Sequence, residues 1–350
     1  MQLLRLLVIG GLVMTGMVGS AWGKEFRVGV LYWSGNIPGQ VAMSKGLEAE
    51  ARRVNADAAA KGRPTVKLVI RTAGDGSSGI ENQIRQMKEL VHDKVDLLIV
   101  QPTDNAALAE PLRMANRAGI PVVAYDQYIS GGTLAAYRTS DNYQAGYLDG
   151  EYIASKFPRE KQLRIVLVEY PHVSSTVERV NGFIDALEQA GQKYRVLKSY
   201  TAVEPVSGAK AGAALLKDFP ARGSIDVVFT VNDGGGLAVV EKLAKAGRNE
   251  IMVATIDGDP ASVKNIRAGR LTVIDAAQFC GPLGAEAFKA AYALLNREKI
   301  PYHALVPVFP ITKETLKQYP GWMGPIPAAF AKPWKSPVPQ WSGTMRTVKP

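Results

Sequence analysis

The stretch from Gln83 to Asp126, QIRQMKELVHDKVDLLIVQPTDNAALAEPLRMANRAGIPVVAYD, is the most informative part of the sequence about its architecture. Short runs rich in Val, Ile and Leu at 95–100 and 120–124 alternate with longer segments at 79–92 and 104–117. The short runs are almost continuously apolar, which is typical of strands buried on both faces of a parallel sheet. The longer segments carry apolar residues at helical spacing. The stretch therefore predicts a β-α-β-α unit.

The same alternation extends in both directions along the chain and restarts at Asp141. Pro111 lies inside the predicted helix 104–117 and should kink it, because proline lacks a backbone donor. Two sets of about four β-α units predict an α/β protein with two doubly wound, parallel-sheet lobes. The other predicted strands are 26–32, 66–70, 164–168, 196–200, 225–231 and 251–256, and the other predicted helices are 40–60, 141–156, 175–190, 209–219 and 237–246.

The first 23 residues predict export. Arg5 precedes an uncharged, mostly apolar run from Leu6 to Val18, and small residues flank Trp22 before Lys24. This pattern is typical of a secretory signal peptide cleaved after Gly23. The alternative is a membrane anchor, but the apolar run is shorter than the ~20 residues that a spanning helix needs. We expect a periplasmic protein.

Composition narrows the classes of partner and chemistry. The net charge is +10, but the basic residues are scattered over predicted helix faces, so nucleic acid is not expected as a partner. The single cysteine, Cys280, excludes an intramolecular disulfide. From about residue 318 the chain is rich in proline and holds three of its five tryptophans, so we expect an extended tail held on the body by those rings.

Polar side chains follow most of the predicted strands, where ligands bind in open α/β sheets. Carboxylates accept hydrogen bonds, and amides both donate and accept, which suits the hydroxyls of a sugar; an aromatic ring can stack on its apolar face. Helix capping is the simpler interpretation for Asp104, Asn105 and Asp233. The candidate ligand-binding residues at these strand ends are Trp33, Asn36, Gln101, Asp126, Gln127, Tyr170, Asn232, Asp257 and Gln278.

At these positions the sequence resembles the ribose- and galactose-type periplasmic binding proteins, relatives of the LacI-type repressors. The likeness covers Phe26 to about Thr312 and is most specific in the stretch quoted above. Shorter matches are SDN at 140–142, ERVNGF at 178–183, VND at 231–233 and IDG at 256–258. The resemblance implies two lobes of type 1 topology joined by three crossing strands, with the ligand in the cleft.

By that resemblance the chain divides into an N-terminal lobe of residues 24–140 plus about 279–305 and a C-terminal lobe of 141–278 plus about 306–317, followed by the tail 318–350. The resemblance also adds Arg179, within ERVNGF, as a donor to ligand oxygens. Asp126 would accept from hydroxyls, and Asn232, Asp257 and Gln278 would complete the second lobe's contacts, with Gln101 as a further polar contact.

The sequence departs from the ribose type in the first lobe. Gly39 and Gln40 stand where that type carries two aromatic residues, and Gln127 follows Asp126 where an arginine is usual. Trp33 is the remaining aromatic candidate there. These departures put ribose itself in doubt but leave the class unchanged, so we expect a monosaccharide or polyol ligand.

The resemblance implies a non-enzymatic component of an ABC transporter that closes on its ligand and delivers it to a membrane permease, without metal or cofactor. The main alternative is a periplasmic sensor that presents ligand occupancy to a histidine kinase or chemoreceptor. An enzyme is less expected, because no nucleotide-binding loop, nucleophile elbow or zinc-protease motif is present, although His172 near Glu169 could act as a base. A DNA-binding repressor is disfavoured by the predicted signal peptide.

Overall fold

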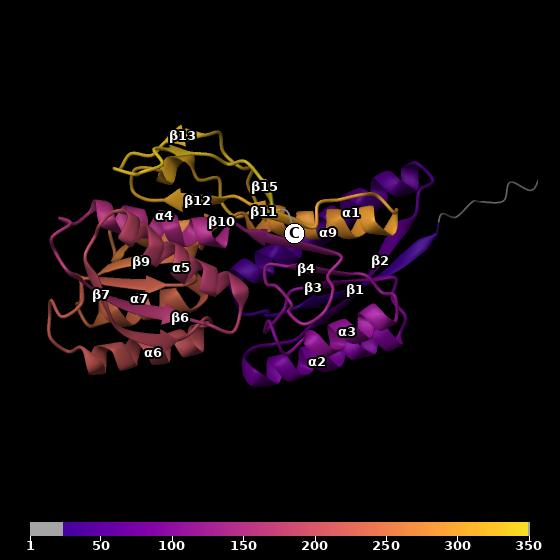
Figure 1. The fold of residues 1–350 in the computed structure, drawn as a ribbon, viewed down its shortest axis with the longest axis horizontal. Coiled ribbons are helices and arrows are strands. Elements are labelled where there is room, and N and C mark those ends of the chain that lie inside the picture. Colours follow the sequence, from indigo (N-terminus) through magenta and orange to yellow (C-terminus); the bar gives the residue numbers. More distant parts are fainter. Residues whose placement is uncertain (1–23, 349–350) are drawn as a thin grey trace, which may run out of the picture.

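The computed structural model describes residues 24–348, which form two α/β lobes side by side (Figure 1). The N-terminal lobe contains a seven-stranded sheet in the order β15-β11-β5-β4-β3-β1-β2. All its neighbouring strands are parallel except β11 and β15. Its strands are β1 (Glu25–Tyr32), β2 (Thr65–Thr72), β3 (Leu97–Val100), β4 (Val122–Tyr125), β5 (Ala136–Ser140), β11 (His303–Val306) and β15 (Arg346–Val348).

Helices cover both faces of this sheet, as buried parallel strands require. Figure 1 shows α1 and α9 on one face and α2 and α3 on the other. The strand β3 is fully buried, in keeping with its continuous apolar sequence. The helices of this lobe are α1 (Pro38–Ala60), α2 (Gly76–His92), α3 (Ala109–Arg117) and α9 (Cys280–Leu295).

The C-terminal lobe repeats this plan with a six-stranded sheet in the order β12-β10-β9-β8-β6-β7. Only β12 runs antiparallel to its neighbour. Its strands are β6 (Leu163–Glu169), β7 (Tyr194–Thr201), β8 (Val227–Thr230), β9 (Met252–Asp257), β10 (Thr272–Gln278) and β12 (Val308–Ile311). Its helices are α4 (Asn142–Ser155), α5 (Ser174–Gln189), α6 (Pro205–Asp218), α7 (Asp233–Lys245) and α8 (Pro260–Ala268).

Helices α4 and α5 pack against each other through glycines. A Cβ added at Gly146 would overlap the carbonyl oxygen of Arg179, and one added at Gly182 would overlap that of Tyr143. The two helices therefore approach as closely as their backbones allow. This contact places α5, and Arg179 on it, against the start of α4.

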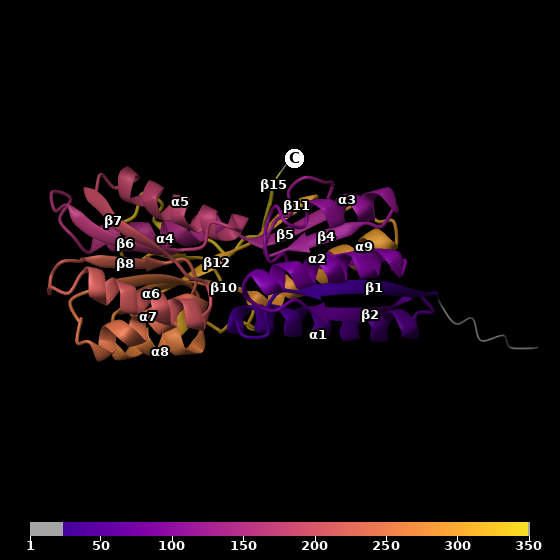
Figure 2. The same ribbon diagram turned by 90° about the horizontal axis from the view of Figure 1, so that it is seen from below.

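The chain crosses between the lobes at three places around which they can hinge: from β5 to α4, from β10 to α9 and from β11 to β12 (Figure 2). It crosses a fourth time in the tail, which returns from the C-terminal lobe and ends as β15 on the edge of the first sheet. This fourth crossing was absent from the sequence prediction.

The tail lies along both lobes. It contains a 3-10 turn (Leu316–Gln318) and a small two-stranded sheet of β13 (Phe330–Ala331) and β14 (Gln340–Trp341). Trp341 is buried, packs edge-on against Phe309, and donates its indole N–H to the carbonyl of Val308 at 2.7 Å. Lys332 forms a buried ion pair with Glu151 of α4 at 2.5 Å.

Among the differences from the sequence prediction, two concern elements of the N-terminal lobe. Helix α3 begins at Ala109 and not at Asp104, so Pro111 lies in its first turn, where no donor is missed and no kink is needed. Strand β5 was not predicted, because its sequence AYRTS carries polar residues that the fold nevertheless buries.

The predicted signal peptide, residues 1–23, falls outside the described residues. Within residues 24–348, none of the helices is both long and apolar enough to span a bilayer.

Candidate functional site

A polar pocket lies between the lobes, beyond the carboxyl ends of strands from both sheets. It narrows to a cavity of about 20 Å³, roughly the room needed by one water molecule. The lobes must separate before a sugar ring can enter. The pocket is lined by Trp33, Ile37, Gly39, Gln40, Met43, Asp126 and Gln127 from the first lobe, by Val173, Ser175, Thr176, Arg179, Val203, Asn232 and Asp257 from the second, and by Gln278 at the end of β10.

Asp126 is the carboxylate that the first lobe contributes. It follows β4, is 3% exposed, and accepts a hydrogen bond from the amide of Gln101 at 2.9 Å. Gln101 is itself fully buried and also receives the backbone N–H of Trp33 at 3.3 Å. Gln101 therefore does not line the pocket; it holds Asp126 from behind.

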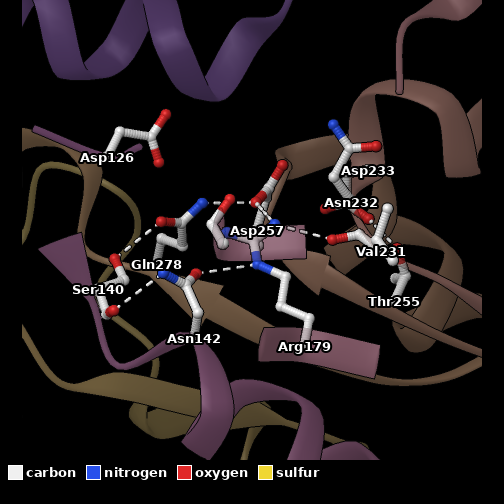
Figure 3. A network of polar contacts seen from close by, with 12 residues as sticks. Asp126, Ser140, Asn142, Arg179, Val231, Asn232, Asp233, Thr255, Asp257 and Gln278 are labelled. Carbon is white, nitrogen blue, oxygen red and sulfur yellow. Dashed lines mark hydrogen bonds and ion pairs between the residues drawn. The ribbon is translucent and has the colours of Figure 1, made fainter. Parts of the chain in front are cut away.

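Arg179 is the only cation among the pocket-lining residues. It is 3% exposed on the buried face of α5. Its Nε donates to Asn142 at 3.0 Å, and its Nη1 donates to the carbonyl of Val231 at 2.7 Å and to the carboxylate of Asp257 at 3.2 Å (Figure 3). These bonds fix the guanidinium plane beside the pocket.

Asp257 connects this network to the crossing strands. The amide of Gln278 donates to its Oδ1 at 2.6 Å, and the hydroxyl of Ser140 donates to Gln278 at 2.7 Å. Ser140 and Gln278 end the two strands that lead into the first and second crossings. A ligand bound to Asp257 would thus contact a network that reaches the hinge (Figure 3).

Burial raises the pKa of both pocket carboxyls. It raises the pKa of Asp126, and the nearby Arg179 guanidinium opposes that rise. Burial also raises the pKa of Asp257 to about 6, against the charge of Arg179 and the bond from Gln278. An ionised carboxylate accepts from a hydroxyl more strongly than a neutral acceptor does. The pocket is therefore suited to a ligand with several hydroxyl groups.

Both carboxylates stand on strained backbone. Asp126 has φ 64° and Asp257 has φ 134°, in the half of conformational space that residues other than glycine rarely occupy. Such strain persists only where the surroundings hold it, and it concentrates at ligand sites. The two lobes therefore present one strained aspartate each, at the ends of β4 and β9.

Trp33 is the only aromatic side chain that lines the pocket. It is 4% exposed and lies 6.0 Å from the Tyr170 ring across the cleft, tilted by 35°. Tyr170 itself lies outside the pocket, in a neighbouring groove. The stacking surface is thus one tryptophan face bordered by aliphatic residues.

Of the remaining predicted residues, Asn232 and Gln127 line the pocket and Asn36 does not. Asn36 is exposed, donates to Asp75 at 2.8 Å, and is not among the residues that line the pocket. Asn232 lines the pocket, but its side chain caps α7 at Gly235 and donates to Val203. Gln127 lines the pocket and accepts the backbone N–H of Ser175 across the cleft at 3.3 Å.

The three residues assigned to helix capping make different kinds of hydrogen bond in the structure. Asp104 accepts from two backbone N–H groups of the following turn, as a capping residue does. Asn105 instead accepts the backbone N–H of Ser174 in the opposite lobe at 3.1 Å. Asp233 is not the cap of α7; its carboxylate accepts from Thr255 and from the backbone of Asp259.

Several lining residues were missed by the sequence analysis. Ser175 and Thr176 open α5, just beyond the end of β6, so the strand-end rule could have found them. Met43 lies more than a turn into α1, and no sequence signal distinguishes it from a core methionine.

The fold and the site together define a clamp: two sheets whose strand ends face each other across one polar pocket. The family profile described as the periplasmic binding protein domain matches residues 28–299. The chain belongs to the periplasmic binding protein family, a family of binding proteins, as the resemblance implied.

Individual proteins of known sequence or structure show the same similarity. The ribose import binding protein of Bacillus subtilis is 30% identical over 280 residues, 79% of this chain and 84% of the relative. That of Escherichia coli is 30% identical over 227 residues, 65% of this chain and 74% of the relative. The crystal structure of a Bacillus halodurans solute-binding protein with bound myo-inositol superposes with a TM-score of 0.72 at 22% identity, covering 85% of this chain and 98% of that one. The predicted fold class is confirmed.

Proposed function

We propose that this protein is a periplasmic solute-binding protein that captures a monosaccharide or polyol by closure of its two lobes and delivers it to an ABC-type permease. One observation carries the proposal. Asp126 from one lobe and the Arg179–Asp257–Gln278 network from the other line the same buried pocket. A ligand that bridges them makes its full set of contacts only when the lobes are closed, so it shifts the population toward the closed form.

The relatives support the class of ligand. Curated relatives are ribose import binding proteins, and solved neighbours hold D-allose and myo-inositol. Carboxylates, amides and one guanidinium match the hydroxyl groups that these molecules share. A single tryptophan face can stack on a pentose, a hexose or a cyclic polyol, so the stacking surface does not favour one of these ligands.

The predicted signal peptide and the family support the compartment and the partner. Residues 1–23 have the sequence of a leader that would be cleaved after Gly23, which would release the mature protein into the periplasm. The closed form, with both lobes in register, is the form that a permease would recognise.

A periplasmic sensor is the second candidate. A fructose-binding periplasmic domain of a hybrid two-component system superposes with a TM-score of 0.71 at 22% identity, covering 83% of this chain and 92% of that one. Crosslinking of the ligand-loaded protein to native membranes would separate the two. The proposal predicts a permease subunit as the captured partner; a histidine kinase or chemoreceptor would favour the sensor.

A thermal-shift screen of sugars and polyols tests the binding function. A ligand at a hundred times its dissociation constant adds about 2.7 kcal/mol to the free energy of unfolding. Asp126→Asn and Arg179→Ala should abolish the shift. Arg248→Ala is the matched control, because its guanidinium is equally buried and bonded to the carbonyls of Phe219 and Ala221, away from the pocket. If the two pocket variants respond as the wild type does, the site is wrong.

A further inference from the structure

The start of the tail contacts the backbone of the ligand site. The indole N–H of Trp322 donates to the carbonyl of Asp257 at 2.5 Å. The hydroxyl of Tyr319 donates to the carbonyl of Gly258 at 3.2 Å. Two consecutive carbonyls behind the pocket carboxylate are thus held by side chains that lie about 60 residues further along the chain.

The backbone at this corner requires external support. Asp257 has φ 134° and Gly258 has φ 81°, so two consecutive residues lie in the left-handed half of conformational space. The N–H of Gly258 is held by Asp275 at 2.8 Å. The carbonyls turn away from the sheet, toward the tail.

In the N-terminal lobe, the strained backbone at Asp126 is held by donors from a neighbouring strand. The carbonyl of Asp126 accepts hydrogen bonds from Thr139 at 2.8 Å and from Tyr137 at 3.3 Å. Both donors lie on the neighbouring strand β5. In the second lobe the corresponding carbonyl is held by the indole of Trp322.

The tail is itself fixed where it makes these bonds. The carbonyl of Trp322 accepts the N–H of Gly281, at the start of α9, at 3.0 Å. The ring of Tyr319 stacks on Phe309 of β12, with 5.7 Å between centroids. Tyr319 is therefore fixed on the lobe that carries Asp257, and Trp322 is fixed at the start of α9, directly after the second crossing between the lobes.

We propose that Trp322 and Tyr319 are positioning residues of the binding site, which hold the Asp257–Gly258 backbone so that the Asp257 carboxylate faces the ligand. The proposal rests on the proposed function, because it takes Asp257 as a ligand contact. It makes the first part of the tail a component of the site and not only a covering of the surface.

Paired substitutions test this role. Trp322→Phe removes the indole N–H and leaves a smaller aromatic ring, and Tyr319→Phe removes the hydroxyl and keeps the ring. Trp334→Phe is the control for the first, because Trp334 is a half-buried tail tryptophan whose N–H binds Glu151, away from the pocket. Tyr292→Phe is the control for the second substitution, since the Tyr292 hydroxyl donates to the carbonyl of Pro64 and both residues belong to the N-terminal lobe.

Two measurements are made on the full-length mature protein. The first is calorimetric titration with D-ribose, D-allose and myo-inositol. We expect Trp322→Phe to weaken binding about fivefold, the usual net effect of one hydrogen bond, with a smaller loss for Tyr319→Phe and none for the controls. The second is hydrogen exchange of residues 255–260 without sugar, which should accelerate in the two test variants alone.

The outcomes separate this inference from the proposed function. If the wild type binds none of the three compounds, the sugar-binding proposal is weakened, and the exchange measurement still decides the role of the tail. If Trp322→Phe binds sugar as tightly as Trp334→Phe does, and exchange at 255–260 is unchanged, the positioning role is refuted.

Discussion

Asp257 combines three properties: a buried charge, a strained backbone and a position where several hydrogen-bond chains meet. It is 5% exposed, and its carboxylate is shared between Arg179 and Gln278. Burial of a charge costs free energy unless the charge is paired and hydrogen-bonded. The pairing here is incomplete, because the same guanidinium also lies near Asp126. A bound hydroxyl group would supply a further donor.

The raised pKa of Asp257 makes a pH prediction. Its pKa is about 6 in the folded protein and ~3.9 in the unfolded chain, so between these values the folded state binds a proton that the unfolded state has released. The free energy of unfolding should therefore rise as pH falls from 7 through 6, and level off near pH 4. Asp257→Asn lacks this increment, which is at most about 3 kcal/mol.

Urea denaturation of both proteins between pH 5 and 7.5 measures this difference. Sugar affinity should move in the opposite direction and weaken below pH 6, because protonation removes a charged acceptor. Equal pH slopes for the wild type and the Asn variant would show that Asp257 is not the titrating group.

At the scale of elements, the packing of α4 on α5 positions Arg179. Gly146 faces the backbone of Arg179 so closely that a methyl group has no room. Gly146→Ala should therefore force the helices apart, and overpacking of this kind costs about 1–3 kcal/mol despite the better helix propensity of alanine. Ligand affinity should fall with stability, as α5 carries the guanidinium. Thermal unfolding measures the loss of stability, and calorimetric titration measures the loss of ligand affinity. Gly35→Ala is the control, because a Cβ at Gly35 meets open space.

The tail is held to the C-terminal lobe by a charge pair that is almost completely buried. The side chains of Lys332 and Glu151 are 1% and 2% exposed, and Glu151 also accepts from Trp334 and Ser336. Lys332→Met leaves a buried carboxylate without its cation, which should cost about 3–5 kcal/mol. In urea unfolding, adding Glu151→Gln should recover part of that loss. Wild-type stability for Lys332→Met alone would contradict this view of the tail anchor.

Elements with strong periodicity were predictable from sequence. The apolar runs LLIV and VVAY were predicted as buried strands, and the polar residues directly after VVAY located Asp126 and Gln127 at the cleft. Strand β5 was missed because its polar residues Arg138, Thr139 and Ser140 are buried by bonds to distant partners, such as Ser140 to Gln278. The sequence did not indicate that Asn36 lies outside the pocket lining, because periodicity does not determine which way a loop side chain points.

At the scale of the whole molecule, the lobes are already bonded across the cleft. Gln127 accepts from Ser175, Asn105 accepts from Ser174, and the N–H of Tyr128 donates to the Ser174 hydroxyl at 3.0 Å. The N–H of Asn105 also donates to the carbonyl of His172 at 3.1 Å, so these bonds gather at the start of α5 and in the loop before it. A ligand that adds contacts to both lobes favours the closed form over the open one by the free energy of those added contacts.

The interlobe distance tests the clamp directly. In the closed form the start of α2, at Gly76, and the start of α6, at Ser207, line one groove across the cleft mouth. Spin labels are placed at the exposed positions Ser77 and Lys210, in a protein whose buried Cys280 is replaced by Ser. Double electron–electron resonance then measures the distance between the two labels, and so between the two lobes. Saturating sugar should narrow a broad distribution to its short component, with a midpoint equal to the calorimetric dissociation constant. A sugar that binds tightly and leaves the distribution unchanged would contradict closure on the ligand.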